Sequence, residues 1–128
     1  MWFEHAIGRE KINFMFDNEF SLIDLELISF SFNYSSVHLV FSCRNIPKKY
    51  PVKWEKDGFN SLVLNITLSG VIDFESKGNN VMFTSNPIIE TTKDYSFLKI
   101  DSPELYLFCR AKFLNIDDIK PYVDDRWD

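Results

Sequence analysis

Few side chains in this sequence are suited to act as a base, a nucleophile or a soft metal ligand. The only histidines are His5 and His38, and the only cysteines are Cys43 and Cys109. A nucleophile needs a neighbouring base, and no Ser, Cys or carboxylate pattern accompanies either histidine. Zinc needs about four ligands at a recognisable spacing, which these four scattered residues do not offer. We therefore predict neither a metal nor a cofactor.

Carboxylates are abundant, because the chain holds 19 Asp and Glu residues. Asp73 and Glu75 are two residues apart and so share one face of a strand. An acid pair of the glycosidase type is the alternative there, but the polar face of a strand carries charge in most β proteins. With only four glycines the chain has little room for a phosphate-binding loop. We predict that the protein is not an enzyme.

The charge balance indicates the class of partner. A net charge of −5 and a pI near 5.0 disfavour nucleic acid and anionic membranes and favour cationic partners. The charge is also uneven. Residues 44–60 carry a net charge of +3 and the remaining chain carries −8, of which the tail from Asn115 contributes −3. Such a dipolar surface can steer a charged protein partner, although a solvated face and a frayed terminus would give the same counts.

The positioning elements are predicted to be mostly strands. Aromatic residues make up 16% of the chain, 13 of them Phe, and aromatic residues suit a pleated, half-buried surface. Apolar alternation over Ile28–Phe32 and Val37–Cys43, with turn residues between, predicts an antiparallel hairpin. The alternation slips by one residue near Leu27, which predicts a β-bulge there.

The strongest alternation lies after a long, proline-containing loop at residues 44–60. Its apolar members are Leu62, Leu64, Ile66, Leu68, Ile72 and Phe74, with Gly70 in the one empty place. A flat strand of this length, about 50 Å at 3.3 Å per residue, is too long for a small domain to cover. We therefore predict one strand that bends at Gly70.

The rest of the chain adds further strands and at most one or two short helices. We expect strands at residues 95–100 and 105–113, the latter central because both of its faces are apolar. Asn115 is positioned to cap a short helix at residues 116–120, whereas residues 1–19 fit a helix or an edge strand equally well. The predicted fold is a single domain over residues 1–128, mainly β, with a curved antiparallel sheet that forms a half-barrel or a sandwich.

No membrane span or signal peptide is apparent, so we expect a cytoplasmic protein with both cysteines reduced in the core.

Trp54, in the loop at residues 44–60, is either a binding anchor or a plug for one end of the core, and we favour the plug. Trp127, in the acidic tail, is either docked on the domain or exposed for contact.

Several segments resemble a known family. They are Pro51-Val52-Lys53-Trp54, Gly58-Phe59-Asn60 and the alternating strand Leu62–Leu68 that leads into Gly70-Val71. Together with the preceding strand pair and proline-containing loop, they are similar to the bacterial immunity proteins of the family called immunity protein 50, over roughly residues 20–115. The resemblance implies a mainly β protein that neutralises a polymorphic or contact-dependent toxin in the cytoplasm of the producing cell.

The predicted function is therefore binding of a cognate toxin domain, with a nuclease as the expected toxin, and occlusion of its active or substrate-binding site. The candidate toxin-binding residues, chosen for charge and tail position, are Asp73, Glu75, Asp117, Asp118, Asp124, Asp125 and Trp127. The alternative function is a β domain that encloses a small apolar ligand in its curved sheet. The oligomeric state does not follow from the sequence.

Overall fold

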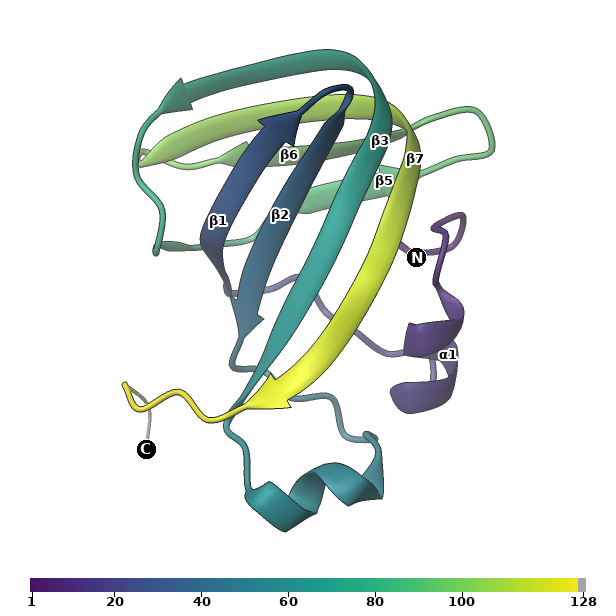
Figure 1. The fold of residues 1–128 in the computed structure, drawn as a ribbon, viewed down its shortest axis with the longest axis vertical. Helices are drawn as coiled ribbons and strands as arrows, with labels where there is room; N and C mark the ends of the chain where they lie inside the picture. Colours follow the sequence, from purple (N-terminus) through teal and green to yellow (C-terminus); the bar gives the residue numbers. More distant parts are fainter. Residues whose placement is uncertain (127–128) are drawn as a thin grey trace.

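A computed structural model describes residues 1–126 and contains one seven-stranded antiparallel sheet in the order β4-β1-β2-β3-β7-β6-β5, which is not closed (Figure 1). The strands are β1 (Leu25–Asn33), β2 (Ser36–Cys43), β3 (Ser61–Gly78), β4 (Thr84–Ser85), β5 (Ile88–Thr91), β6 (Ser96–Asp101) and β7 (Leu105–Tyr122). A short helix, α1 (Glu10–Met15), and a 3-10 helix, η1 (Val52–Asp57), complete the elements. The predicted mainly β fold with a curved sheet is confirmed.

The two long strands β3 and β7 run side by side and bend together (Figure 1). Gly70 has a φ of +66°, and the register shifts between Val71 and Asp73. The lower part of the sheet pairs β1, β2, residues 61–69 of β3 and residues 113–122 of β7. The upper part pairs the remaining halves of β3 and β7 with β6 and β5. The predicted bend at Gly70 is thus confirmed.

The bulge that follows Gly70 also changes which side chains reach the core. Leu62, Leu64, Ile66 and Leu68 are fully buried, as the alternation predicts. Ile72, which shares their parity, is instead 49% exposed, because it is the extra residue at the register shift: Val71 pairs with Ala111 and Asp73 with Arg110, which leaves Ile72 without a partner residue on β7.

The predicted hairpin and the bulge near Leu27 are confirmed in β1 and β2, but the predicted helix at residues 116–120 is wrong. The segment continues β7 as far as Tyr122. A second register shift occurs here, because Asn65 pairs with Asp118 whereas the next residue, Ile66, pairs with Ile116. Asp117 is the extra residue, so Ile116 and Ile119, three apart, both face the core. A spacing of three, which normally indicates a helix, here results from a bulge.

The inner side of the bent sheet is filled by side chains. Residues 1–19, which the periodicity left open, contain α1 and a single parallel bridge from Ile7 to Asn115 of β7. Buried residues of the N-terminal segment, among them Phe3, Ile12 and Phe16, belong to the hydrophobic core.

The loop before β3 closes the lower end of the core. Trp54 of η1 contacts the rings of Phe16, Tyr50 and Phe59, which confirms the interpretation of this tryptophan as a plug. Both cysteines are free and buried, and burial raises the pKa of Cys43 to about 11 and that of Cys109 to about 12. They are core residues, as predicted.

The bend yields a first testable prediction, in which Gly58 serves as the control. A Cβ at Gly70 would lie 3.1 Å from the Cβ of Lys112, whereas one at Gly58, which has a similar φ of +64°, would meet nothing within 4 Å. A positive φ alone costs a residue that has a side chain about 1–3 kcal/mol. We expect Gly58→Ala to lower the free energy of unfolding in urea by roughly this amount and Gly70→Ala to lower it further. Equal losses for the two variants would show that close contact between β3 and β7 does not constrain the bend.

Candidate functional site

The inner side of the sheet is occupied by the core, so the broad surface that the sheet offers is its outer side. The bend divides this side into two faces. The polar face lies over the lower part and contains His38, Asn65, Thr67, Asp117 and Asp118. The aromatic face lies over the upper part and contains Tyr95, Phe97, Lys99, Tyr106, Phe108 and Arg110, bordered by Asp73 and Glu75.

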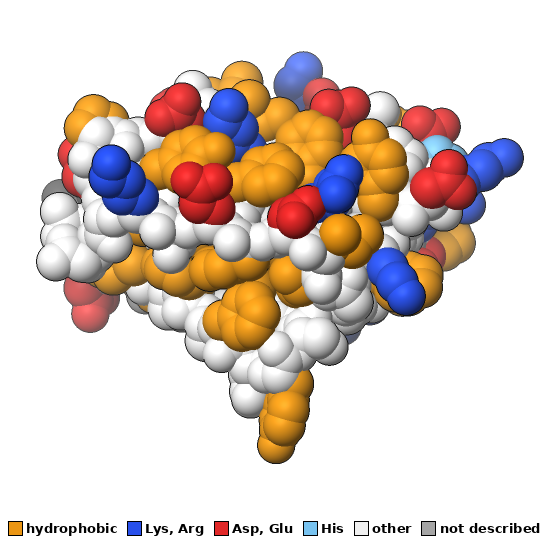
Figure 2. Space-filling view, turned by 90° about the horizontal axis from the view of Figure 1, so that it is seen from above, with side chains coloured by type: hydrophobic (Ala, Val, Ile, Leu, Met, Phe, Trp, Pro, Cys, Tyr) orange, Lys and Arg blue, Asp and Glu red, His pale blue; other side chains and the backbone are white. Residues whose placement is uncertain are grey.

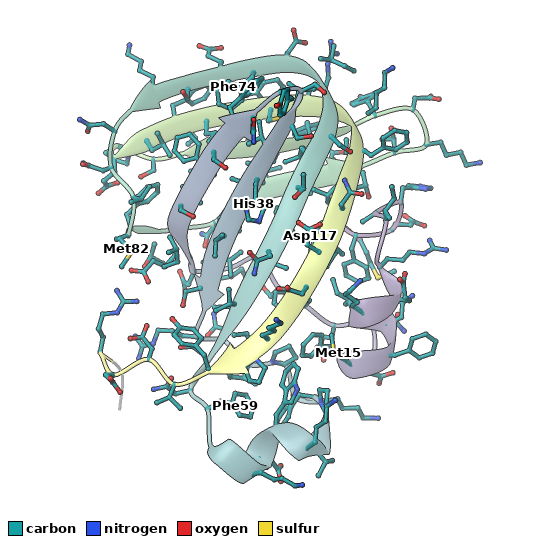
Figure 3. The ribbon with its side chains drawn as sticks, viewed as in Figure 1. Met15, His38, Phe59, Phe74, Met82 and Asp117 are labelled. Atoms are coloured by element: carbon teal, nitrogen blue, oxygen red, sulfur yellow. The ribbon has the colours of Figure 1, made fainter. Side chains whose placement is uncertain are left out.

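The centre of the polar face is a carboxylate that meets both a hydroxyl and an imidazole. Thr67 Oγ1 donates to Asp117 Oδ2 at 2.6 Å, and His38 Nε2 lies 4.0 Å from the same oxygen. Figure 3 shows His38 and Asp117 on the front of the lower sheet, where strand pairing sets His38 beside Thr67. The side chains of His38 and Asp117 are 44% and 40% exposed, so both are open to a partner.

Asp118 is held in a similar way. Asn65 Nδ2 donates to Asp118 Oδ1 at 2.9 Å, and Lys120 Nζ lies 3.9 Å from the other oxygen. The bulge in β7 brings the side chains of Asp117 and Asp118 to the same side of the sheet, beside their partners on β3. The strand thus presents two neighbouring carboxylates in fixed orientations.

The order of groups on the polar face favours binding over nucleophilic catalysis. In a catalytic triad the imidazole stands between the hydroxyl and the carboxylate, whereas here the carboxylate of Asp117 stands between Thr67 and His38. Two half-exposed carboxylates are instead suited to accept hydrogen bonds from the cationic side chains of another protein.

The aromatic face combines rings with cations. The Phe97 and Phe108 rings lie 5.9 Å apart, and the Arg110 guanidinium lies 5.8 Å from the Tyr95 ring centroid. Lys99 Nζ is 6.0 Å from the centroid of Tyr106. Figure 2 looks down on the upper part of the sheet and shows hydrophobic side chains gathered in the middle, with acidic and basic ones around them.

Asp73 and Glu75 lie on this aromatic face, opposite Arg110 and Phe108 of β7. Arg110 Nη2 donates to Asp73 Oδ2 at 2.7 Å, so the charge of Asp73 is partly balanced within the chain. The structure therefore brings the candidate carboxylates together in two pairs, Asp73 with Glu75 and Asp117 with Asp118, one pair on each side of the bend.

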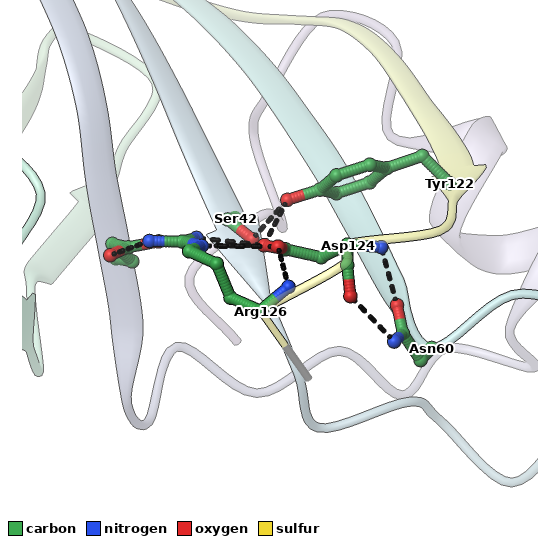
Figure 4. A network of polar contacts seen from close by, with 6 residues as sticks. Ser42, Asn60, Tyr122, Asp124 and Arg126 are labelled. Atoms are coloured by element: carbon green, nitrogen blue, oxygen red, sulfur yellow. Dashed lines mark hydrogen bonds and ion pairs between the residues drawn. The ribbon is translucent and has the colours of Figure 1, made fainter. Parts of the chain in front are cut away.

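Asp124, another candidate residue, has a structural position instead. It is 7% exposed, and its carboxylate accepts hydrogen bonds from the Tyr122 hydroxyl at 2.9 Å and from Arg126 Nη2 at 2.7 Å (Figure 4). Its backbone N–H donates to Asn60 Oδ1, and its backbone carbonyl accepts from Asn60 Nδ2. Arg126 also pairs with Glu26 at 2.6 Å, so the tail is fastened across the lower end of the sheet.

This network shifts two ionisation equilibria. The hydrogen bond from Arg126 is the main reason that the pKa of Asp124 lies well below its ordinary range, and the same bond raises the pKa of Arg126. Of the remaining tail candidates, Asp125 is exposed, and Trp127 lies outside the described residues.

The surface cavity with the largest apolar lining does not support the apolar-ligand alternative, because it lies outside the curve of the sheet. This cavity of about 670 Å³ opens on the surface between α1 and residues 48–55, beside Phe14 and Val52. Among residues 1–126, no group of three or more His, Cys, Asp and Glu side chains could hold a metal ion. Nor does any helix in this range have the length and apolar character to cross a membrane.

The aromatic face is the part of the surface that the sequence did not predict. The signal was present, since Tyr106, Phe108 and Arg110 alternate with the buried residues of β7. From the sequence alone, apolar residues on both faces of a strand indicate only that the strand is central. The strand is central, between β3 and β6, yet its outer side chains Tyr106, Phe108 and Arg110 are only partly buried.

Comparison with models of known protein families gives a match over most of the chain. A family model described as immunity protein 50 matches residues 8–122. No curated protein and no solved structure matches.

The tail network leads to a second prediction, which concerns stability against pH. A depressed folded pKa means that Asp124 contributes stability above its unfolded pKa, about 3.9 for Asp, and loses that contribution as pH falls toward the folded value. We expect Asp124→Asn to lower the Tm at pH 7 and the difference from the wild type to narrow below about pH 4.

Its control is Asp125→Asn, which changes the same charge at the exposed neighbouring position. Thermal unfolding followed by circular dichroism from pH 2 to 8 should leave this variant close to the wild type. A constant gap between Asp124→Asn and the wild type over the whole range would contradict an ionised, stabilising Asp124.

Proposed function

Because the chain belongs to the immunity protein 50 family, we propose that it binds a cognate toxin domain and neutralises it by covering the toxin's active or substrate-binding site. The membership supports an immunity protein with a toxin as its protein partner. The proposed setting is the cytoplasm of the bacterium that makes the toxin, where the bound domain cannot act on its own host.

One observation carries the choice of surface. Four of the five candidate carboxylates that are open to solvent, Asp73, Glu75, Asp117 and Asp118, project from the outer side of β3 and β7, and the fifth, Asp125, lies in the tail. These two strands pair along nearly their full length, so the carboxylates stand on a stiff support. On a chain with a net charge of −5, this support is a negatively charged platform for a cationic partner.

The proposed mechanism is occlusion with electrostatic steering. A nuclease binds phosphate through Lys, Arg and His side chains, and carboxylates can pair with those same groups. Thr67 and Asn65 already fix the orientation of Asp117 and Asp118, which lowers the entropy lost when the complex forms. Asp73 offers less free charge, because Arg110 pairs with it.

A third prediction tests the steering role of the polar face. The double variant Asp117→Asn/Asp118→Asn removes two charges at nearly constant shape. We expect its association rate with the purified toxin domain encoded immediately upstream to fall about tenfold at low salt, and the salt dependence of that rate to weaken. Stopped-flow fluorescence at several ionic strengths measures both quantities.

The matched control is Asp24→Asn/Asp94→Asn, which removes the same charge from two exposed positions outside both faces. It should change the association rate much less. An association rate of the wild type that does not respond to salt would reject the electrostatic part and leave inhibition standing. Failure of the wild type to bind or inhibit this toxin would reject the proposed function as a whole.

A further inference from the structure

We infer that the aromatic face is the anchor that holds the toxin in place, whereas the polar face mainly guides its approach. This inference rests on the proposed function and assigns the binding energy to particular side chains. The starting observation is that apolar groups occupy the outer side of β6 and β7, although the fold does not require them there.

The core of the upper sheet is complete without the outer rings. Leu98, Ile100, Leu107 and Cys109 fill the inner side of β6 and β7 and are fully buried. Phe97, Tyr106 and Phe108 point the other way and are only partly buried. A contiguous apolar patch that the core does not use is the usual mark of a protein-binding surface.

The composition of the aromatic face is that of an interface centre. Tyr, Phe and Arg are enriched in interface cores, and Tyr and Arg in the few residues that contribute most of the binding energy. Here Arg110 is flanked by the Tyr95 ring at 5.8 Å and the Asp73 carboxylate at 2.7 Å. Lys99 likewise lies over an aromatic ring, that of Tyr106.

These contacts also hold the face in shape before a partner arrives. Cross-strand pairing sets Phe97 beside Arg110 and Lys99 beside Phe108 on one rigid pleat. A preformed surface loses little side-chain freedom on binding, so more of the contact energy appears as affinity. The face therefore has the properties of an anchor rather than those of an adaptable loop.

Charge defines the partner as a basic protein surface with apolar side chains among its cations. Carboxylates border the rings on three strands, with Glu75 on β3, Asp101 on β6 and Glu90 on β5. The cations near the centre, Arg110 and Lys99, are each held against a ring, and a third cation, Lys77 of β3, lies opposite Tyr106 at the border. A second copy of this chain fits less well, because two molecules of charge −5 repel each other.

The two faces are continuous across the bend. Phe113, which pairs with Ser69 and is 52% exposed, lies between the aromatic face and the polar face on the outer side of β7. One toxin domain that covers the bend would contact both faces, approach through Asp117 and Asp118, and pack its apolar side chains on the rings of Phe97 and Phe108.

The test separates the two roles by kinetics, with the same purified toxin domain encoded upstream as the probe. We expect Phe97→Ala/Phe108→Ala to raise the dissociation rate of the complex about thirtyfold or more, as loss of interface hot spots does. The association rate should stay within about threefold, since no charge is removed. Phe14→Ala, at an 86% exposed Phe on α1, is the matched control and should dissociate like the wild type.

A second measurement needs no substitution in the aromatic face. In hydroxyl-radical footprinting of the wild-type complex, we expect Tyr95 and Tyr106 to lose reactivity. Tyr34, which is 95% exposed in the β1–β2 turn, should keep it. This readout stands even if the double variant fails to fold.

Three outcomes would overturn the inference. If the toxin binds but Tyr95 and Tyr106 remain reactive and dissociation is unchanged, the anchor lies elsewhere and the proposed function survives. If the substitutions only dissolve a dimer seen by light scattering, the face serves self-association. If the wild type does not bind the toxin, the proposed function and the inference fall together.

Discussion

The continuous pairing of β3 with β7 through a shared bend is the constraint on which the rest of the structure depends. Each strand has 18 residues, and the pair joins the lower and upper parts of the sheet. Gly70 lets β3 turn without straining its backbone, and the neighbouring bulge restores the inward side of the strand at Phe74, which packs on Phe32 of β1 at 5.1 Å. The core, the two outer faces and their relative direction all follow from this one turn.

Much of this fold could be predicted from alternation alone, because a strand with one buried side repeats every two residues. The hairpin, the bulge near Leu27 and the bend at Gly70 follow from that rule. The rule fails at Ile116 and Ile119, where a bulge gives buried residues the spacing of three that is typical of a helix. Pairing of this segment with β3 outweighs the helix-capping preference of Asn115. The rule also left residues 1–19 open, because α1 has only six residues and is held by tertiary contacts.

The candidate site was predictable in its charge but not in its arrangement. Asp73 and Glu75 were expected to share a face and do, whereas the link between Asp117 and His38 depends on the register of β2, β3 and β7. Asp124 and Asp125 cannot be told apart from the sequence, since both are aspartates in the acidic tail. The structure shows that Arg126 and Tyr122 hold the carboxylate of Asp124, whereas Asp125 is exposed. The aromatic face could not be predicted, because the sequence does not reveal whether an apolar side chain on a strand is covered by another layer or exposed to solvent.

The central claim is that the outer side of the bent sheet meets the toxin. The most direct measurement is a crystal structure of the chain bound to its cognate toxin domain. The account predicts toxin side chains against both Asp117 and Phe108, with the toxin's active or substrate-binding site covered by β3 and β7. A complex in which the toxin sits at the α1 and η1 end, with the outer side of the sheet left in solvent, would contradict it.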